Sequence, residues 1–477
     1  MLAIRAIFCF NIGEQLEGRA TAMPQWKKND LCTLDITGYT SDGMGVARLE
    51  GLVVFVPRTI RGERWQVQLL KVNKNVAWGR GVELLTPSPA RMDSDCPHFG
   101  PCGGCQFRHM DYAEELDAKR RQVEDALRRI GGAEVTVDVI HGAADTCRYR
   151  NKVQFPVAGG VGEVRLGLFR SRSHQVLDVP DCLLQSEGAN RLGRTLKEWM
   201  EQKSIAPYDE TTGQGLVRHL FVRSNRAGQH LACVVVNGKK LPDEGGMVAA
   251  LRSAEPGLAG VVLNVNREDT NVVLGSQYRT LWGEDRLEQT LCGKKFRLSV
   301  PSFFQINPNQ TEVLYSRAVD FAQLTGTETV LDLYCGIGTI SLALADRAGR
   351  VIGAEIVPEA IADAKENAAR NGVTNAEFFC GDAGEIAQKL AADGVRPDVI
   401  CVDPPRKGLA PGVTDVLADM DPKRIVYVSC DPATLARDVK RLAQRGYGLV
   451  RAEAVDLFPR THHIESVVLL ERRSDFV

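Results

Sequence analysis

Two short segments near the C-terminal end carry side chains that could act together in covalent catalysis. Residues 429–432 read Ser-Cys-Asp-Pro, so Cys430 lies in a loop directly after an apolar run. A thiolate can add to an electron-poor ring carbon, and a nearby base must then remove a proton before the thiolate can leave again. Glu465, just before the last apolar run, is the candidate base. A cysteine after a strand is more often only a small apolar residue, and we expect that of three others: Cys335, Cys380 and Cys401.

A second set of residues predicts a site for a nucleoside-containing cofactor. Residues 332–339 read Asp-Leu-Tyr-Cys-Gly-Ile-Gly-Thr, and the two glycines let the backbone approach a ligand at a helix N-terminus. Glu355 ends the next apolar run about twenty residues later, where a carboxylate can accept both ribose hydroxyls. Asp382 and Asp403 end the following two runs and can contact the adenine edge and the methionine moiety. Dinucleotide folds usually have a third glycine where residues 340–341 are Ile-Ser, which favours S-adenosylmethionine over NAD.

Three cysteines in a glycine-rich loop, Cys96, Cys102 and Cys105, are spaced to bind a metal centre together. Cys182 is the best candidate for a fourth ligand, and Cys147 is its less favoured rival. The spacing alone does not separate a zinc ion from an iron–sulfur cluster. The chain has 13 cysteines, an odd number, and we expect no signal peptide at its start. We therefore expect a reducing, cytoplasmic location and metal or catalytic uses rather than disulfides.

From about residue 329 the sequence alternates buried strands with helices, which is typical of a doubly wound parallel sheet. The expected strands are 329–334, 351–355, 376–380, 398–403 and 424–429. Ligands bind such sheets at the carboxyl ends of the strands. The candidate cofactor residues and Cys430 all fall at such ends, so we expect an α/β Rossmann-like domain that brings them together.

The chain before this sheet is expected to form two further parts. Short β-rich runs at 31–39, 45–57 and 64–84, with a turn at 41–43, predict a small barrel of about five strands of the OB type. A linker at 86–89 and the cysteine loop follow. We expect helices at 112–130, 187–201 and 247–254 and strands at 152–155 and 230–236, the mixture of an α+β domain. The expected division is a leader, a candidate for disorder, at 1–24, the barrel at 25–88, a central α+β domain with the cysteine site at 89–300, and the cofactor-binding domain at 301–477.

The composition restricts function only weakly. Hydrophobic residues make up 44% and charged residues 25%, as in ordinary globular proteins, and no run offers the roughly 18 apolar residues that a membrane-spanning helix needs. The net charge of -1 gives no argument for nucleic acid, although residues 141–230 carry an excess of four positive charges. A solvated surface explains such an excess about as well as a phosphate track does. The basic residues that could form a track are Arg148, Arg150, Lys152, Arg165, Arg170 and Arg172.

Four sequence blocks carry a specific resemblance. Residues 303–307 (Phe-Phe-Gln-Ile-Asn), 403–408 (Asp-Pro-Pro-Arg-Lys-Gly), 429–432 and 458–465 (Phe-Pro-Arg-Thr-His-His-Ile-Glu) resemble the signature blocks of the RNA (uracil-5-)-methyltransferase family. The resemblance spans nearly the whole chain from residue 25 onward. The barrel region is similar to the TRAM module, an RNA-binding attachment of this family. Members that act on 23S ribosomal RNA carry that module together with an iron–sulfur cluster.

The resemblance implies a role for each candidate residue. Cys430 would add to carbon 6 of a uridine, carbon 5 would take the methyl group of S-adenosylmethionine, and Glu465 would remove the carbon-5 proton. Phe303 would stack on a flipped base. The implied cofactor contacts are Gln305, Tyr334, Gly336, Thr339, Glu355, Asp382 and Asp403. Family members often have asparagine where Thr339 stands, a departure that concerns this one contact.

The resemblance also implies a metal cofactor, a 4Fe-4S cluster on Cys96, Cys102, Cys105 and Cys182. We expect the neighbouring His462 and His463 to position other groups or to lie at the surface, not to bind a metal.

For the substrate we expect RNA, and 23S ribosomal RNA in particular, because the transfer-RNA members of the family lack the cysteine loop. No DNA and no membrane partner is expected, and we expect a monomer. The alternatives are a transfer-RNA enzyme, an amino-group methyltransferase built on Asp403 that would need neither Cys430 nor Glu465, and a non-catalytic RNA-binding iron–sulfur protein.

Overall fold

The computed structural model describes residues 26–473, so the leader expected at 1–24 lies outside the described residues. The chain forms two compact units. The first ends at Ser88, and the second begins at Pro89 and also includes Tyr39–Gly43.

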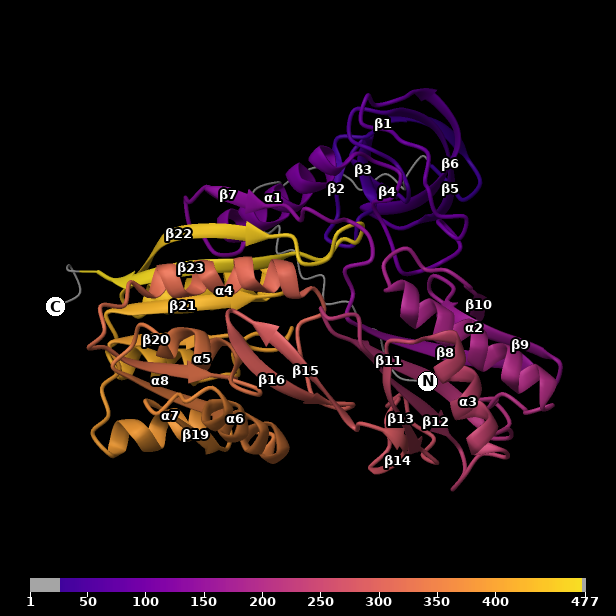
Figure 1. The fold of residues 1–477 in the computed structure, drawn as a ribbon. Coiled ribbons are helices and arrows are strands. Elements are labelled where there is room, and N and C mark those ends of the chain that lie inside the picture. The colour runs from indigo at the N-terminus through magenta and orange to yellow at the C-terminus, as the bar shows by residue number, and fades with distance from the viewer. Residues whose placement is uncertain (1–25, 474–477) are drawn as a thin grey trace. The chain divides into compact units, whose positions relative to one another are not determined.

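The first unit is built on a single sheet of six strands in the order β1-β5-β6-β4-β3-β2 (Figure 1). Its strands are β1 Leu31–Asp35, β2 Gly38–Tyr39, β3 Gly45–Leu49, β4 Leu52–Val56, β5 Arg64–Val72 and β6 Val76–Thr86. Alternate side chains such as Leu34, Val54 and Val67 form its core, as period-two burial requires. Each of the three expected β-rich runs is divided into two strands. The division at Glu50 and Gly51 follows from their positive φ angles of 46° and 91°, which turn the chain tightly.

The second unit begins with the cysteine loop and contains a seven-stranded sheet in the order β10-β9-β8-β11-β12-β13-β14. Its strands are β8 Lys152–Gly160, β9 Glu163–Phe169, β10 Val176–Asp178, β11 Val217–Ser224, β12 His230–Val236, β13 Leu258–Val265 and β14 Gln277–Gly283. Helices α2 (Glu187–Gln202) and α3 (Glu244–Ala254) bury Leu196 and Leu251 against it. The expected α+β pattern of this region is therefore present, with β8 and α3 longer than expected and β12 at its expected bounds.

An eight-stranded sheet in the order β19-β18-β17-β20-β21-β23-β22-β7 forms the rest of the second unit. Its strands are β7 Val139–His141, β17 Thr329–Leu333, β18 Arg350–Glu355, β19 Ala376–Cys380, β20 Val399–Val402, β21 Arg424–Ser429, β22 Tyr447–Val455 and β23 Glu465–Arg472. Strands β17 to β21 run parallel, as expected, whereas β23 is antiparallel to both of its neighbours. The chain order reverses between β17 and β20, which is where open α/β sheets bind ligands.

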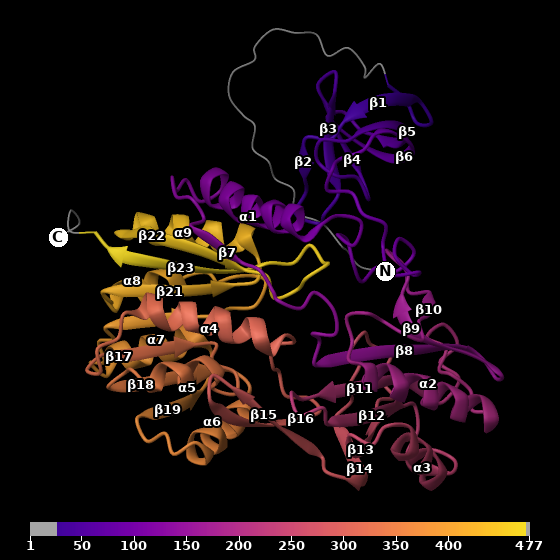
Figure 2. The ribbon, with the colours of Figure 1, turned by 45° about the horizontal axis from the view of Figure 1, so that its top comes forward.

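Helices cover both faces of this sheet. Helices α4 (Pro308–Ala322), α5 (Thr339–Ala345) and α6 (Pro358–Arg370) pack on one face. Helices α1 (Tyr112–Arg129), α7 (Ala383–Ala392), α8 (Val413–Asp419) and α9 (Pro432–Gln444) pack on the other, with α1 beside α9 (Figure 2). A hairpin of β15 (Arg286–Leu291) and β16 (Lys294–Ser299) precedes α4. Among the described residues, no helix is long and apolar enough to cross a membrane.

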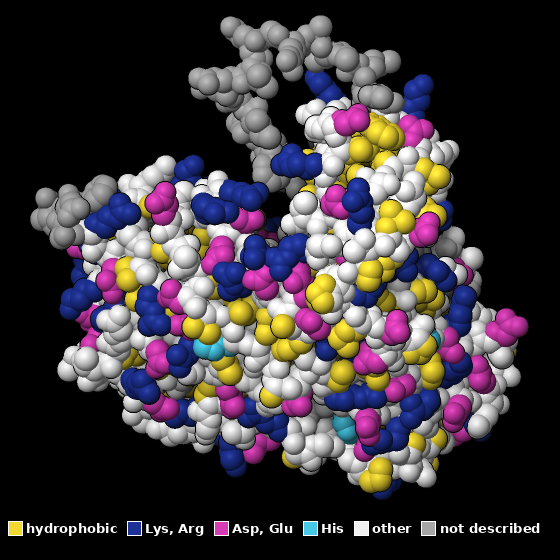
Figure 3. Space-filling view, turned by 90° about the horizontal axis from the view of Figure 1, so that it is seen from above, with side chains coloured by type: hydrophobic (Ala, Val, Ile, Leu, Met, Phe, Trp, Pro, Cys, Tyr) yellow, Lys and Arg dark blue, Asp and Glu magenta, His cyan; other side chains and the backbone are white. Residues whose placement is uncertain are grey.

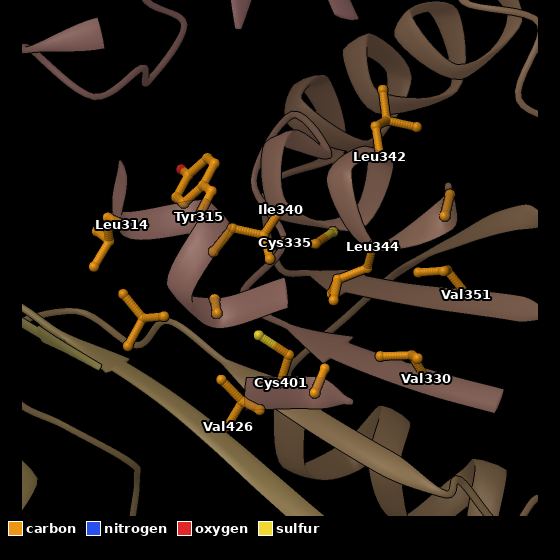
Figure 4. Packing of buried hydrophobic residues seen from close by; sticks show 14 of the residues in the cluster. Leu314, Tyr315, Val330, Cys335, Ile340, Leu342, Leu344, Val351, Cys401 and Val426 are labelled. Carbon is orange, nitrogen blue, oxygen red and sulfur yellow. The ribbon is translucent and has the colours of Figure 1, made fainter. Parts of the chain in front are cut away.

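The cysteines expected to be small apolar residues divide into two kinds. Cys335 and Cys401 are buried in the core on the α4 face, next to Ile340 and Val426 (Figure 4). Cys380 is exposed, so its prediction is wrong. The reason is its position at the end of β19, which is the outermost strand of the sheet.

Candidate active site and cysteine cavity

The turn between β17 and α5 has three residues in left-handed backbone conformations. Gly336 and Gly338 have φ angles of 55° and 83°, and Tyr334, which carries a side chain, has 67°. A Cβ atom at position 338 would lie 3.2 Å from the Phe378 ring. Left-handed non-glycine residues cost energy and are concentrated at functional turns. The helix that follows has no side-chain N-cap, so a ligand can bind its first N–H groups.

Two carboxylates beside this turn are fixed by backbone hydrogen bonds. Glu355, at the end of β18, accepts from the N–H of Gly336 at 3.3 Å and from that of Val357 at 3.0 Å. Asp382 is the N-cap of α7 and accepts from the N–H of Gly384 at 2.9 Å. Both predicted cofactor residues therefore stand at strand ends next to the glycine turn, in orientations that local contacts set.

Asp403, at the end of β20, lies among buried polar groups. Burial and then the charge of Asp332 raise the pKa of Asp403 to about 7. Burial also raises the pKa of Asp332 to about 7, although the hydroxyl of Ser341 donates to its carboxylate. The hydroxyls of Tyr315 and Thr339 lie 3.0 Å apart, and the charge of Asp403 contributes, after burial, to a raised pKa of Tyr315. The predicted contacts Thr339 and Asp403 are thus gathered around Tyr315.

The segment between β16 and α4 carries two more predicted residues. The side-chain amide of Asn151 donates to the carbonyl oxygen of Gln305 at 2.8 Å, and the backbone N–H of Asn151 donates to the carbonyl oxygen of Ile306 at the same distance. Phe303 is 67% exposed, whereas Phe304 beside it is buried. The segment is therefore anchored at Gln305 and presents the Phe303 ring to solvent.

Cys430 and Glu465 come from neighbouring antiparallel strands. β21 pairs with β23 so that Ser429 is opposite Ser466. One step further along the two strands, Cys430 and Glu465 are therefore side by side at the carboxyl end of β21. Asp431 caps α9 by accepting from the next backbone N–H groups at 3.0 and 2.9 Å, which fixes the loop that holds the cysteine.

Burial and nearby negative charge raise the pKa values of both groups. Burial, then the charges of Glu465 and Asp403, raise the pKa of the Cys430 thiol to about 12. Burial, then Asp403, raises the pKa of Glu465 well above its usual range. The Oε2 atom of Glu465 is buried without a hydrogen-bond partner among the described residues. A buried polar atom without a hydrogen bond costs free energy in a folded protein.

Arg406 is a positive charge that acts on both groups. Its guanidinium lowers the pKa of Cys430 and that of Glu465 against the other influences. Its Nη2 atom lies 3.4 Å from Nδ1 of His463, and burial, His462 and Arg406 together lower the pKa of His463 to about 3. The imidazole is therefore neutral beside the guanidinium. Arg406 was given no role from the sequence, although it lies three residues after Asp403 in the same sequence block and this position could have indicated a role in the site.

Sequence reasoning also overlooked a buried ion network between α1 and the segment that follows β22. Lys119 and Asp456 are joined at 2.7 Å with neither side chain exposed. The two residues are 337 positions apart, so no local pattern could have linked them.

The four predicted cluster ligands line one cavity of about 250 Å³: Cys96, Cys102, Cys105 and Cys182. Burial is the main cause that raises the pKa of three of these thiols, that of Cys105 to about 12. Cys147 is not among the described residues that line the cavity, and its sulfur accepts from Nη2 of Arg108 at 3.3 Å. Within residues 26–473, no three His, Cys, Asp or Glu side chains are gathered as a single metal ion would require.

The basic residues of the central domain have different surroundings. Arg148 pairs with Asp181 at 2.7 Å. Arg150 and Lys152 line the cysteine cavity, and burial lowers the pKa of Lys152 to about 8. Arg165, Arg170 and Arg172 are exposed. On the face drawn in Figure 3, positive and negative side chains are interspersed.

Comparison with protein families places the chain among known enzymes. Residues 111–473 match the family described as tRNA (Uracil-5-)-methyltransferase, and residues 25–82 match the TRAM domain. The chain is 42% identical over 450 residues to an uncharacterized RNA methyltransferase of Clostridium tetani, covering 94% of this chain and 98% of that protein. It is 43% identical over 449 residues to an uncharacterized RNA methyltransferase of Halalkalibacterium halodurans, with the same coverage.

A solved structure shares the fold over nearly the whole chain. It is the tRNA (uracil-54, C5)-methyltransferase of Pyrococcus abyssi in complex with S-adenosyl-L-homocysteine. The TM-score is 0.73 at 27% identity, and the match covers 92% of this chain and 100% of that one.

Proposed function

Since this chain belongs to the tRNA (uracil-5-)-methyltransferase family, we propose that Cys430 is its catalytic nucleophile and Glu465 its general base. The protein is an S-adenosylmethionine-dependent RNA (uracil-5-)-methyltransferase. The observation that carries the proposal is the adjacency of the Cys430 thiol and the buried Glu465 carboxyl group, whose Oε2 atom has no hydrogen-bond partner among the described residues.

Carbon 5 of uracil is a poor nucleophile, and Cys430 changes that. Its thiolate adds to carbon 6, which opens the 5,6 double bond and moves an electron pair toward carbon 5 and the neighbouring carbonyl oxygen. Carbon 5 then attacks the methyl carbon of S-adenosylmethionine, and S-adenosylhomocysteine leaves with the electron pair of the broken bond. Glu465 removes the proton from carbon 5, the double bond re-forms, and the Cys430 thiolate is expelled.

The Cys430 thiol must lose its proton to solvent before the thiolate can add, because its pKa of about 12 keeps it protonated near neutral pH. The raised pKa of Glu465 makes its carboxylate a stronger base once it forms. S-adenosylmethionine brings, besides its methyl group, a positive sulfonium, and such a charge favours the thiolate and the carboxylate. Arg406 acts in the same direction on both groups. The bound cofactor and Arg406 would thus both favour the charged forms of Cys430 and Glu465.

For the cofactor we assign the residues around the β17 turn. Glu355 would accept the ribose hydroxyls, Asp382 would contact the adenine edge, and Asp403 would face the methionine moiety. The N–H groups at Gly336 and the start of α5, together with Tyr334, Thr339 and Gln305, would complete the pocket. Phe303 would stack on the extruded base, and its exposed ring supports this role.

For the cysteine cavity we propose a 4Fe-4S cluster on Cys96, Cys102, Cys105 and Cys182. Cluster ligands bind separate iron atoms, so they surround a cavity and do not converge on one point as zinc ligands do. The four thiols line one cavity of about 250 Å³, which supports the proposal. The proposed reaction moves no electrons to or from the cluster, so its role here would be structural.

The proposed substrate is a uridine of 23S ribosomal RNA, in the cytoplasm, and the cysteine loop is the feature that favours it. Transfer RNA is the second candidate, because the matching family is described as a tRNA methyltransferase and the structurally similar Pyrococcus abyssi enzyme is one too. The TRAM domain is common to both proposals as an RNA-binding attachment.

Nucleoside mass spectrometry tests the proposal. Unmodified 23S ribosomal RNA and unmodified transfer RNA are each incubated with the protein and S-adenosylmethionine, with Cys430→Ala as the control. We expect 5-methyluridine in the ribosomal RNA with the parent protein and none with the variant. Methylation of transfer RNA alone would overturn the ribosomal assignment, and 5-methyluridine made by the variant would overturn the role of Cys430.

A further inference from the structure

The segment that delivers Glu465 is held from outside by a part of the chain more than 300 residues away. We call residues 456–464, between β22 and β23, the catalytic loop, and residues 106–119, which follow the cysteine loop and enter α1, the strap. Both lie in the same compact unit. Their contacts are ionic and hydrogen-bonded.

The ionic contact is a buried ammonium group between two carboxylates. Lys119 is fully buried and its Nζ atom donates to Oε1 of Glu115 at 2.8 Å and to Oδ1 of Asp456 at 2.7 Å. It also donates to the carbonyl oxygen of Phe458 at 3.2 Å, and the hydroxyl of Tyr112 donates to the other oxygen of Asp456 at 2.8 Å. The first residues of the catalytic loop are therefore bound to α1 through charge-assisted hydrogen bonds.

The middle of the catalytic loop is held in a conformation that it would not adopt alone. Arg460 has a φ of 71°, in the region that costs a residue with a side chain about 1–2 kcal/mol. Its N–H donates to Oε1 of Glu115 at 2.7 Å, and its carbonyl oxygen accepts from the N–H groups of Gln106 and Phe107 at 3.0 and 3.1 Å. Its guanidinium donates to the carbonyl oxygen of Met110 at 3.2 Å. These contacts with strap residues hold the backbone of Arg460 in its left-handed conformation.

The last part of the catalytic loop is tied to the cysteine loop through one side chain. Oε1 of Gln106 accepts from the N–H of His462 at 3.3 Å, and its Nε2 donates to the carbonyl oxygen of Gly103 at 3.0 Å. Phe458 packs against the small apolar cluster that contains Cys182, with Cys105 at its margin. The strap therefore connects the cysteine cavity to the loop that ends at Glu465.

Glu465 depends on this support because it has little of its own. Its backbone is fixed by pairing with Val455, but its buried Oε2 atom has no hydrogen-bond partner among the described residues. Among the described residues, no hydrogen bond at Oε2 therefore fixes the direction of the carboxyl group. His463, two residues earlier, lies against Arg406, which acts on both Glu465 and Cys430.

We propose that the strap positions Glu465 for proton removal, with Lys119 and Gln106 as its positioning residues. The proposal rests on the proposed function of Glu465 and adds how that group is aimed. It concerns the last step of the reaction, after the thiolate has added and the methyl group has been transferred. Loss of the strap should therefore slow release of the methylated RNA and leave the earlier steps intact.

RNA with 5-fluorouridine at the target position separates these steps. A base cannot remove fluorine as a cation, so the covalent adduct forms and persists whatever the state of Glu465. We compare Lys119→Met and Gln106→Ala with the parent protein, and Gln106→Glu serves as the conservative variant that keeps the acceptor oxygen. Arg121→Ala, an exposed position on α1, is the matched control. A melting curve checks that each variant is folded.

With ordinary RNA we expect Lys119→Met and Gln106→Ala to lose about tenfold or more in turnover and to accumulate the covalent protein–RNA species. With fluorinated RNA their rate of adduct formation should stay within about twofold of the parent, and Gln106→Glu should recover turnover. If Lys119→Met does not fold, Gln106→Ala carries the test.

Unchanged turnover in folded variants would overturn the proposal, and so would an equal loss of turnover and of adduct formation. If the parent protein itself forms no adduct with fluorinated RNA, the proposed function fails first, and the strap proposal fails with it.

Discussion

The two sides of the active site are held in different ways. On the cofactor side, Glu355 and Asp382 are fixed by N–H groups only two residues further along the chain or in the adjacent turn. On the catalytic-loop side, Arg460 and Asp456 are fixed by α1 and the strap, more than 300 residues away. The first arrangement is a property of local sequence, and the second exists only in the folded unit.

This difference decides how each side tolerates change. A local cap or turn contributes about 1 kcal/mol and can be lost without moving its neighbours. A buried ion network fails as a whole, because removing one member leaves a charge without a partner in the interior. The catalytic loop is thus held by stronger contacts than the cofactor side. A single substitution in its ion network therefore destabilises it more.

Replacing the proposed base should give the largest effect on catalysis after loss of the Cys430 thiol. Glu465→Gln keeps the shape of the side chain and removes its basicity, so turnover should fall by about 10²–10⁴-fold. The covalent intermediate should accumulate with ordinary RNA, as seen by gel shift under denaturing conditions. Glu471→Gln on the same strand is the control. A variant that turns over normally would show that another group removes the proton.

The thiol of Cys430 should respond steeply to pH in the ligand-free protein. Its pKa of about 12 means that the unreactive thiol persists through neutral pH and that thiolate appears as pH rises. Alkylation of Cys430, followed by peptide mass spectrometry, should therefore accelerate about tenfold per pH unit between pH 8 and pH 11. The exposed Cys380 serves as a reference for access by the reagent. A rate that is already maximal at pH 8 would contradict the neutral resting state.

Loss of the buried ammonium should be the largest change in stability. Lys119→Met leaves Glu115 and Asp456 facing each other without a cation, and the free energy of unfolding should fall by about 3–5 kcal/mol. Denaturant titration measures it. Arg121→Ala, whose pair is exposed, should change stability by no more than about 0.5 kcal/mol. Equal effects of the two variants would mean that the network does not hold the loop.

A smaller effect is expected on the cofactor side. Gly338→Ala adds a side chain at a φ of 83° and brings a methyl group against Phe378. Holding the turn in its cofactor-binding conformation should therefore cost about 1–2 kcal/mol more free energy. Calorimetry should show a correspondingly weaker affinity for S-adenosylmethionine. Gly372→Ala has a similar φ of 65° and no close neighbour at its Cβ position, so it should leave the affinity unchanged. Equal losses of affinity in both variants would mean that reduced stability of the protein, and not the glycine turn, weakens binding.

What could be predicted from the sequence follows the same division. The parallel strands of the sheet, the glycine turn and the acids at strand ends were predictable because each depends on a short pattern. Cys430 and Glu465 were assigned from their blocks, and the antiparallel pairing of β21 with β23 makes them neighbours. The four cavity cysteines were found from spacing together with the family resemblance.

Contacts between distant segments were not predictable. No period or spacing connects Lys119 to Asp456 or Gln106 to His462, because such pairs arise only when two elements pack. The exposure of Cys380 was also missed, since the order of strands decides which strand lies at the edge. The three β-rich runs were found without their internal turns, because Glu50 carries no turn signal of its own.

The proposed mechanism depends above all on a bond between Cys430 and the uracil ring. The most direct test is to incubate the parent protein with S-adenosylmethionine and 5-fluorouridine-containing RNA, then to digest the complex and locate the modified peptide by mass spectrometry. We predict one nucleotide adduct, carrying the transferred methyl group, on the peptide that contains Cys430. An adduct on another cysteine, or 5-methyluridine formed from ordinary RNA with no covalent species in the fluorinated reaction, would contradict the mechanism.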